Sequence, residues 1–402
     1  MTTQPAGPLA GLKVFDLTRV LAGPTCVQML ADLGADVVKI EKPGSGDDTR
    51  GFAPPYMPGT TESAYFVGAN RNKRSVTLDI ARPEGQEIAL RLIAQSDILA
   101  ENFKVGALAK YGLGYEQLHP RFPGLIYCSI TGFGQTGPYA SRPGYDGLMQ
   151  AMGGVMSLTG EPDGPPQKVG IPIADLFAGL YGCIGILAAL RHRERTGQGQ
   201  QVDIGMLDTH VAWLANQGMN YLATGENPPR LGNQHPNIVP YQVFATADGF
   251  IVLSIANDPT FRRFCDNFGL SHLADDARFA TNAARVQNRQ LVTDTLAPIM
   301  QRHATGWWVE RLEALKIGCG PINRLSDVFA DPQVQARDVV REMAHGSGAA
   351  VKVIANPVRL SETPAEYRLP PPLLGEHTEE ILHDRLGMDG ATLARLRGEG
   401  VI

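Results

Sequence analysis

One carboxylate interrupts a long apolar stretch near the middle of this chain. Asp175 is the only charged residue between Ile171 and Leu190. An ionised carboxylate in apolar surroundings is unfavourable unless it has a partner or its pKa moves. A helix start would explain it, because an acidic side chain is favourable at the positive end of a helix dipole, and the residues alone favour that interpretation. The chemical alternative is a nucleophile, placed where free helix amides could stabilise negative charge on a substrate.

Further candidates lie on both sides of this stretch. Tyr145 and Asp146 follow a glycine in a turn-rich segment, where they either form a local turn or support the Asp175 site. A later loop contains Gly232, Asn233 and His235. It is either a plain exposed loop or a mobile cover over a site, and His235 could titrate near neutral pH.

Basic residues gather in the segment Asn70–Arg74, and others follow predicted strands at Lys42, Arg50, Lys104 and Lys110. A solvated face is the usual meaning of such a run. The alternative is a phosphate-rich ligand, bound where the strands of an open α/β sheet end. The residues leave both interpretations open. No set of His, Cys, Asp or Glu has metal-ligand spacing, so we predict no metal site and no tightly bound cofactor.

Composition excludes several classes of protein. The chain has 36 basic and 41 acidic residues, a net charge of −5, which gives no global field for nucleic acid or an anionic membrane. Its five cysteines are scattered without a C-x-x-C pair, as in an intracellular protein with free thiols. No signal-peptide pattern opens the sequence. The apolar run around Asp175 is long enough to span a bilayer, but its proline, aspartate and glycines favour a buried core helix. We therefore expect a cytoplasmic protein with no membrane partner.

The order of apolar segments predicts an α/β fold. Strand-like segments alternate with helical patterns over the first 200 or so residues, which is typical of a Rossmann-like, mostly parallel sheet wrapped by helices. The dinucleotide fingerprint and the Walker motif are both missing. A turn at Asp248-Gly249 joins two strand-like segments in a hairpin. The predicted organisation is a large domain over 1–200, a linker helix over 201–225, a small α+β domain over 226–325, and a return to the large domain with a C-terminal tail over 326–402.

A set of segments, in this order, resembles the class III (CaiB/BaiF-type) CoA-transferases, the family that includes formyl-CoA transferase and carnitine CoA-transferase. The segments are LTRVLAGP (17–24), KIEKPGSGDDTR (39–50), NRNKRS (70–75), ENF (101–103), ITGFGQTGPY (130–139), PGYD (143–146) and GIPIADLFAG (170–179). Later segments are most similar to the succinyl-CoA:glutarate branch: GNQHPNIVPYQVF (232–244), GPIN (320–323), VFADPQV (328–334) and PPPLLGEHT (370–378). The resemblance covers essentially the whole chain.

The resemblance implies a covalent mechanism and an architecture. Asp175 would attack the thioester of an acyl-CoA donor, form a mixed anhydride, and then carry CoA as an aspartyl thioester until an acceptor acid takes it. The implied partners are an acyl-CoA, with succinyl-CoA favoured, and a carboxylic acid, with a dicarboxylate such as glutarate favoured. Coenzyme A is then a co-substrate. The implied monomer is a two-domain ring that interlocks with a second copy in a homodimer.

Site residues follow from the same resemblance, position by position. Asp175 matches the catalytic aspartate, with support from Tyr145, Asp146 and the Gly232, Asn233 and His235 loop. The implied CoA contacts are Val20, Leu21, Ala22, Lys42, Leu78, Asn102, Phe103 and Lys110. Candidates for binding a distal substrate carboxylate are Arg50, Arg71 and Arg230. Leu21 stands where formyl-CoA transferase has a glutamine, which weakens an oxalate-specific interpretation.

Two other functions fit the same resemblance. An α-methylacyl-CoA racemase uses a His–Asp pair to move a proton beside the thioester. The histidine of that pair falls where this chain has Tyr145, and a phenol is a poor base at neutral pH. A CoA-binding homologue without activity is the other alternative, and the presence of Asp175 counts against it.

Overall fold

The computed structural model describes residues 7–402, and the chain forms two compact units. The first unit contains the described residues up to Gly154, then Val169–Trp213 and Gln335–Ile402. The second contains Val155–Lys168 and Leu214–Val334. The predicted boundaries therefore differ in three places. The large domain gives up the short segment 155–168, and the small domain begins at residue 214 instead of 226 and ends at residue 334 instead of 325.

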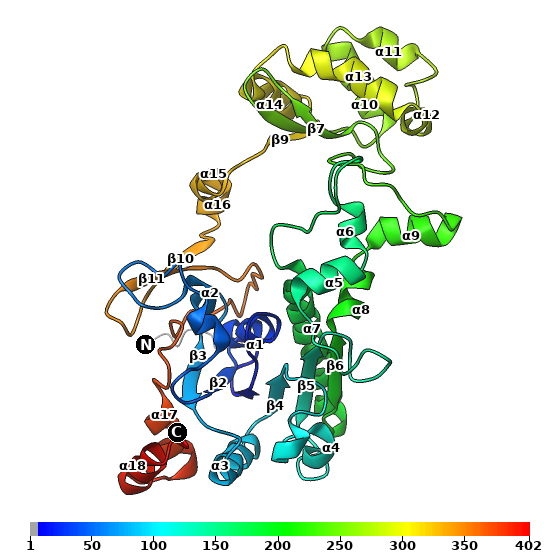
Figure 1. Cartoon of the computed structure of the whole chain (residues 1–402). Helices are drawn as coiled ribbons and strands as arrows, with labels where there is room; N and C mark the ends of the chain where they lie inside the picture. The colour runs from blue at the N-terminus through cyan, green and yellow to red at the C-terminus, as the bar shows by residue number, and fades with distance from the viewer. Residues whose placement is uncertain (1–6) are drawn as a thin grey trace. The chain divides into compact units, whose positions relative to one another are not determined.

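A six-stranded parallel sheet forms the centre of the first unit (Figure 1). Its strands are β1 (Lys13–Asp16), β2 (Asp36–Glu41), β3 (Lys73–Thr77), β4 (Ile98–Glu101), β5 (Ile126–Thr131) and β6 (Gln201–Gly205). They lie in the order β3-β2-β1-β4-β5-β6, which confirms the Rossmann-like prediction. The strand order reverses between β1 and β4. In open α/β sheets, ligands bind outside the carboxyl ends of the strands at such a point.

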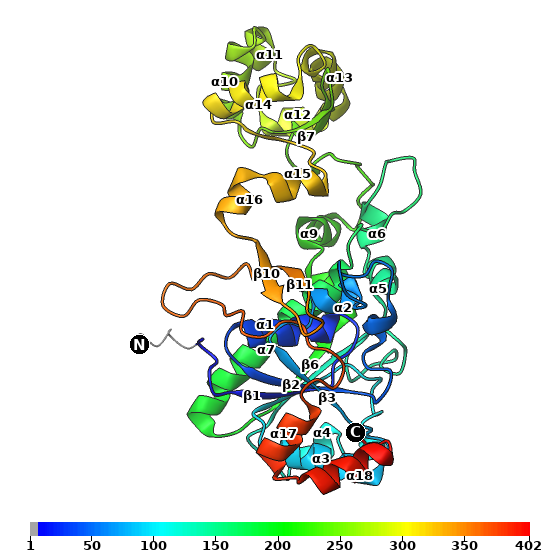
Figure 2. The ribbon, with the colours of Figure 1, turned by 90° about the vertical axis from the view of Figure 1, so that its left-hand side faces the viewer.

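Helices cover both faces of this sheet (Figure 2). On one face α1 (Ala22–Asp32) and α7 (Ile173–Thr196) pack together on the strands. On the other face lie α3 (Pro83–Ile93), α17 (Thr378–Leu386) and α18 (Gly390–Gly398). β1, β2, β4 and β5 alternate their side chains between these two apolar layers, as doubly covered strands do.

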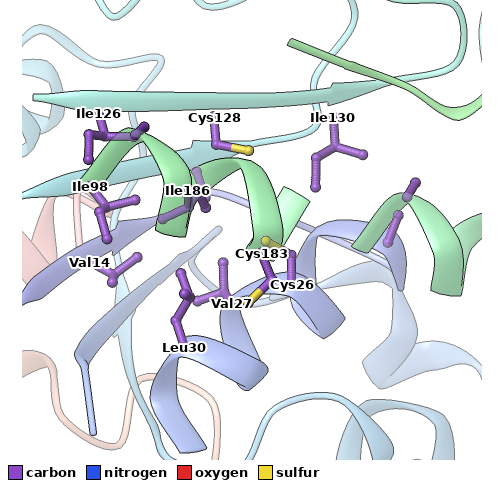
Figure 3. Packing of buried hydrophobic residues seen from close by; sticks show 14 of the residues in the cluster. Val14, Cys26, Val27, Leu30, Ile98, Ile126, Cys128, Ile130, Cys183 and Ile186 are labelled. Atoms are coloured by element: carbon purple, nitrogen blue, oxygen red, sulfur yellow. The ribbon is translucent and has the colours of Figure 1, made fainter. Parts of the chain in front are cut away.

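Helix α7 packs against its neighbours at van der Waals distance through glycines three residues apart. A Cβ added at Gly179 would lie 2.6 Å from the carbonyl oxygen of Ala22, and one at Gly185 would lie 2.6 Å from Val202. Figure 3 shows the resulting core, with Cys26, Cys128 and Cys183 among its side chains. These three thiols are free and buried, as the scattered cysteines predict. In the part of the chain that the structure describes, α7 is the one helix long and apolar enough to cross a membrane, yet it packs on α1, β5 and β6.

Smaller elements complete the first unit. They are η1 (Asp48–Gly51), α2 (Ala64–Gly68), η2 (Ala109–Tyr111), α4 (Tyr115–Leu118), α5 (Asp146–Met152), α8 (Met206–Ala212) and the hairpin β10–β11 (Val340–Ala344, Ala350–Ile354). The predicted linker helix over 201–225 is wrong. Residues 201–205 form β6, hydrogen-bonded to β5, and the helical residues after it are divided between α8 and α9 (Ala215–Thr224).

The second unit is a small α+β domain, as predicted. Its three-stranded antiparallel sheet contains β7 (Tyr241–Ala245), β8 (Phe250–Ser254) and β9 (Gly318–Pro321), and β7 pairs with β8 in the expected hairpin. Trp308 lies at the centre of its apolar cluster and is fully buried. Its helices are α6 (Val155–Leu158), α9, α10 (Asp258–Asn267), α11 (Ser271–Asp275), α12 (Asn282–Gln287), α13 (Arg289–Met300), α14 (Thr305–Ala314), α15 (Leu325–Ala330) and the first part of α16 (Pro332–Ala336).

Candidate active site

A cavity of about 490 Å³ lies outside the carboxyl ends of β1, β4 and β5, where the strand order reverses. Four segments of the first unit line it: the first βα turn (19–22), the loop after β4 (102–105), the end of β5 with the turn that follows it (130–132), and the segment 140–146. Asp175 completes the lining with Phe52, Asp48 and Met206. The cavity therefore contains the carboxylate that the sequence singles out.

Asp175 occupies the first turn of α7, so the helix-start interpretation of this residue is correct as far as it goes. Burial raises the pKa of its carboxyl group to about 7, and the nearby charge of Asp146 adds to the rise. Among the described residues, none forms an ion pair with it. A carboxylate without a cation, facing a cavity and titrating near neutrality, has the properties of a functional group.

Asp146 fixes the position of that helix start. Its Oδ1 accepts a hydrogen bond from the backbone N–H of Ala174 at 2.8 Å, and its Oδ2 accepts one from the Gln150 amide at 2.7 Å. Gln150 in turn accepts from the N–H of Val169 at 2.8 Å, which holds the chain just before α7. The predicted supporting role of Asp146 thus has a physical basis, because it caps the helix that carries Asp175.

Tyr145 also lines the cavity, but its side chain is 70% exposed. It precedes α5 and has extended backbone angles. Its phenol lies in the same cavity as Asp175, and no histidine among residues 7–402 lines that cavity.

The residues that the resemblance assigns to CoA lie along two neighbouring cavities. Val20, Leu21, Ala22, Asn102 and Phe103 line the Asp175 cavity. Lys42 and Leu78 line a second cavity of about 390 Å³. The two cavities share Arg19, Asp48 and Phe103, so a long ligand can extend from one to the other. Lys110 is exposed and lies 4.6 Å from the ring of Tyr111, which lines the second cavity.

Two of the arginines proposed for a substrate carboxylate are used elsewhere. Arg71 is 4% exposed, and its guanidinium group binds both carboxylate oxygens of Asp32, at 2.9 and 2.6 Å. Arg50 binds Glu41 at 2.8 Å and Glu62 at 3.1 Å. Neither guanidinium group lines the Asp175 cavity, and both have carboxylate partners. We therefore correct the prediction for these two residues.

The basic segment Asn70–Arg74 is neither a solvated face nor a phosphate site. Residues 70–73 are buried, and Lys73 begins β3. The Lys73 ammonium group donates to the carbonyl oxygen of Pro24 and to Asn70, each at 3.0 Å, and lies 3.3 Å from Asp16. These cations are parts of the core of the first unit.

The predicted loop residues belong to the second unit. Gly232 has a φ of +56°, and its N–H donates to the carbonyl oxygen of Gly160 at 3.1 Å. His235 stacks on Tyr241 with ring centroids 5.2 Å apart, and its pKa is lowered by burial and by the charge of Arg289. Arg230 donates to the carbonyl oxygens of Glu161 and Gly164. A role for Gly232, Asn233 and His235 as a cover over the site stays a prediction.

Two arginines that were not singled out from the sequence, Arg19 and Arg142, also line the Asp175 cavity. Arg142 is exposed, lines the cavity, and lies 3.9 Å above the ring of Tyr139. The described residues give it no acidic partner, whereas Arg19 in the same lining pairs with Asp48 at 3.2 Å. A basic residue directly before the PGYD segment was the available signal. In the described residues there is no group of three or more His, Cys, Asp or Glu that could hold a metal ion.

A doubly wound sheet with a partly buried carboxylate beside two adjoining cavities suits an enzyme that binds a long ligand. Comparison with known families identifies the class: residues 9–378 match CoA-transferase family III, and the chain belongs to that family. It is an enzyme of the CoA-transferase type, for which CoA is a co-substrate.

Two relatives of known name and one solved structure are similar to this chain over most of its length. The chain is 48% identical to succinate–glutarate CoA-transferase of Agrobacterium fabrum, over 93% of this chain and 95% of that protein. It is 41% identical to human succinyl-CoA:glutarate CoA-transferase, over 98% of this chain and 90% of that protein. Among solved structures, a CaiB/BaiF family protein from Brucella suis superposes with a TM-score of 0.84 at 47% identity, covering 95% of this chain and 100% of that one.

Proposed function

We propose that this enzyme moves CoA from succinyl-CoA to a dicarboxylate such as glutarate, with Asp175 as the covalent carrier. One observation carries the proposal: the Asp175 carboxyl group faces the cavity at the sheet's switch point, and no residue from 7 to 402 forms an ion pair with it. The names of several relatives support the choice of donor and acceptor, since they are succinyl-CoA transferases that act on glutarate, mesaconate or citramalate.

The chemistry balances without any proton donor or added reactant. A carboxylate oxygen of Asp175 attacks the thioester carbonyl, the C–S bond breaks, and CoA leaves as a thiolate from a mixed anhydride. The thiolate attacks Cγ of Asp175, which forms an aspartyl thioester and releases succinate. Glutarate then attacks the same Cγ and expels the thiolate, which attacks the glutaryl carbonyl and restores the carboxylate. The overall reaction exchanges one CoA thioester for another of similar energy, and the covalent intermediates divide it into separate acyl transfers.

The environment of Asp175 favours this sequence in two ways. Partial burial removes water from the carboxylate, which strengthens it as a nucleophile and protects the intermediates from hydrolysis. Asp175 also lies in the first turn of α7, where the positive end of the helix dipole favours the negative charge that develops in each attack. Asp146 orients this turn through Ala174.

Among residues 7–402, the Asp175 cavity lacks the histidine that the racemase alternative needs. Proton abstraction requires a base on the substrate side of the cavity, and no histidine of the described chain lines it. Tyr145, at the position of the racemase histidine, is largely exposed.

Trapping the intermediate tests the mechanism. The enzyme is incubated with succinyl-CoA, treated with hydroxylamine and digested, and the adduct is mapped by mass spectrometry. We expect a hydroxamate on Asp175, because an acyl anhydride or thioester at Cγ reacts with hydroxylamine. A hydroxamate at any other side chain would remove Asp175 from the mechanism.

Arg142 gives a test of the dicarboxylate proposal. If its guanidinium group binds the distal carboxylate of the acceptor, Arg142→Gln should raise the KM for glutarate about 10-fold or more, because a charge-assisted pair is lost. The KM for a monocarboxylate of similar length should stay within about 2-fold. Steady-state kinetics with both acids measures the difference.

Arg121→Gln is the matched control for this experiment, because Arg121 is also exposed and also lies over an aromatic ring, that of Phe122. It lines neither cavity. Equal effects of the two variants, or turnover with monocarboxylates only, would contradict the proposed acceptor.

An interlocked homodimer and a cytoplasmic location belong to the same proposal. The dimer rests on the family resemblance, and the location rests on the scattered free cysteines. The first unit presents large exposed apolar side chains on α5, α7 and α8, among them Leu148, Ile184 and Val211, which suits a surface covered by a second copy. A solution mass of one chain, measured by light scattering, would contradict the dimer.

A further inference from the structure

The first βα turn is the part of the Asp175 cavity whose backbone conformation is least favourable by itself. It connects β1 to α1, and its residues 19–22 line the cavity. Val20 in this turn has a φ of +68°, a left-handed conformation that a β-branched residue adopts only at a cost in energy. Such a conformation persists at a ligand-binding turn only when the surrounding structure imposes it.

The structure imposes it through side chains of neighbouring elements. Asn102, just after β4, brackets the peptide groups of Arg19: its Oδ1 accepts from the Arg19 N–H at 2.8 Å, and its Nδ2 donates to the Arg19 carbonyl oxygen at 2.7 Å. Asp16 accepts from the N–H of Thr18 at 2.8 Å. These bonds fix the first half of the turn.

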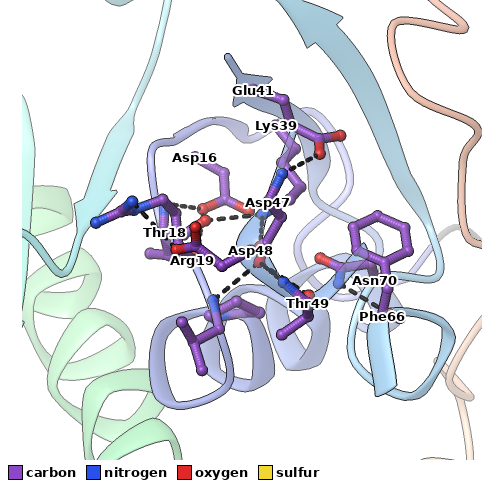
Figure 4. Close-up of polar contacts among 12 residues, drawn as sticks. Asp16, Thr18, Arg19, Lys39, Glu41, Asp47, Asp48, Thr49, Phe66 and Asn70 are labelled. Atoms are coloured by element: carbon purple, nitrogen blue, oxygen red, sulfur yellow. Dashed lines mark hydrogen bonds and ion pairs between the residues drawn. The ribbon is translucent and has the colours of Figure 1, made fainter. Parts of the chain in front are cut away.

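Asp47 and Lys39 hold the turn from a second side, that of β2 and the loop after it (Figure 4). Asp47 Oδ1 accepts from the Val20 N–H at 3.2 Å, and Lys39 Nζ donates to the carbonyl oxygen of Thr18 at 2.7 Å. The two side chains also bind each other at 2.8 Å. Together with Asn102, this pair ties each residue from 18 to 20 to a side chain outside the turn.

The ion pair between Lys39 and Asp47 is buried. Lys39 is 0% exposed and Asp47 is 1% exposed. Burial opposes ionisation of Asp47, but the charge of Lys39 and the hydrogen bonds from Thr49 outweigh it and lower the pKa of Asp47 to about 2. Both groups therefore stay charged at neutral pH. A buried ion pair is weak evidence of a contribution to stability, and a role in fixing one conformation is the better explanation for keeping it.

We propose that Asp47 is a positioning residue for acyl-CoA, which acts through Val20 and, by way of Lys39, through Thr18 to hold the first βα turn against the bound thioester. The inference rests on the proposed acyl-CoA site beside Asp175. Asp47 and Lys39 are among the residues that line the second cavity, but both side chains are fully buried, so Asp47 acts through the turn and not by a contact of its own with the ligand. Its consequence is a specific one: loosening Asp47 weakens acyl-CoA binding and leaves acceptor binding unchanged.

Asp47→Asn tests this consequence, because the change is isosteric but removes the charge that holds Lys39. We expect the KM for succinyl-CoA and the Kd for CoA, measured by titration calorimetry, to rise about 10-fold, with the KM for glutarate within about 2-fold of wild type. The melting temperature also falls, so a control for stability is necessary.

Asp32→Asn is the matched control. Asp32 is a carboxylate that is also 0% exposed, holds a buried cation, Arg71, and lines neither cavity. This variant should lose stability as Asp47→Asn does, and its KM for succinyl-CoA should stay within about 2-fold of wild type. If both variants change the KM for succinyl-CoA equally, Asp47 is structural only and the proposal fails.

A double variant, Lys39→Met with Asp47→Ala, keeps the test valid if Asp47→Asn does not fold. It removes both charges together, so neither partner is left as a buried charge without the other, and it releases both ends of the turn. We expect a folded enzyme with the same rise of about 10-fold in the KM for succinyl-CoA. A wild-type KM in the double variant would overturn the proposal.

Asp175→Ala is measured in parallel. If this variant retains CoA transfer, the proposed function fails, whereas the Kd for CoA in the Asp47 variants still decides the positioning role.

Discussion

Asp175→Asn and Asp175→Ala should each lower kcat for CoA transfer by at least about 10⁴-fold, the scale of loss seen when a covalent nucleophile is removed from an enzyme. All four acyl exchanges of the proposed mechanism pass through the Asp175 carboxyl group, and an amide or a methyl group forms neither the anhydride nor the thioester. Asparagine keeps the shape of the side chain and the fold of the helix start. The measurement is the appearance of glutaryl-CoA from succinyl-CoA by chromatography.

Two controls make this result specific. Asp384→Asn removes an exposed carboxylate of α17 and should leave kcat within about 2-fold of wild type. The alanine variant excludes a return of activity through slow deamidation of the introduced asparagine to aspartate, which the asparagine variant alone would permit. Activity above about 1% of wild type in the alanine variant would show that the reaction does not need a carboxylate at this position.

The sequence predicted those parts of the fold in which local pattern and tertiary role agree. β1, β2, β4 and β5 are short, mostly apolar runs followed by turns, and together with the helices between them they form the predicted alternation of strands and helices. The hairpin β7–β8 was readable because Asp248-Gly249 separates two alternating strands. The family motifs also predicted the order of these elements along the chain, which cannot be inferred from any one element alone.

The predictions for the basic segment and for segment 155–168 were wrong for one physical reason: the residues that bind these segments are distant from them in the sequence. Arg71 and Lys73 look like solvated cations, because the carboxylates that pair with them, Asp32 and Asp16, come from α1 and β1. A strand that begins with a buried lysine, such as β3, therefore has no apolar pattern to reveal it. Segment 155–168 joins the second unit for the same reason, through hydrogen bonds that Arg230 makes to its carbonyl oxygens.

The sequence predicted the reactive group of the candidate site, but only some of the residues that position it. Asp175 was visible because it is a single charge in an apolar run. Asp146 became a helix cap only when the structure showed its bond to Ala174. Asp47 lies in a glycine-rich loop where an acidic residue is unremarkable, and its link to Val20 spans 27 positions of sequence.

The same environment that prepares Asp175 for chemistry should cost the protein stability above neutral pH. The pKa of this carboxyl group is raised from 3.8 to about 7 in the folded chain. Between these two values the folded state holds a proton that the unfolded state has lost, so the free energy of unfolding falls as the pH rises through this window. Above pH 7 the whole cost is present. A shift of this size corresponds to about 4 kcal/mol, and partial exposure and the α7 dipole reduce it to about 2 to 4 kcal/mol.

Asp175→Asn should therefore stabilise the folded protein at pH 8 by about 2 to 4 kcal/mol, and by clearly less at pH 5, where most of the wild-type carboxyl groups are already protonated. Thermal melting of both proteins at the two pH values measures this, because a gain in free energy raises the melting temperature. Asp384→Asn should show no such dependence on pH. An equal gain for Asp175→Asn at pH 5 and pH 8 would mean that the ionised carboxylate is not the source of the cost, and a loss of stability at pH 8 would mean that the α7 dipole outweighs the burial of the charge. The variant thus separates the two explanations of one carboxylate: a helix-start acid loses stability when it is neutralised, and a buried nucleophile gains it.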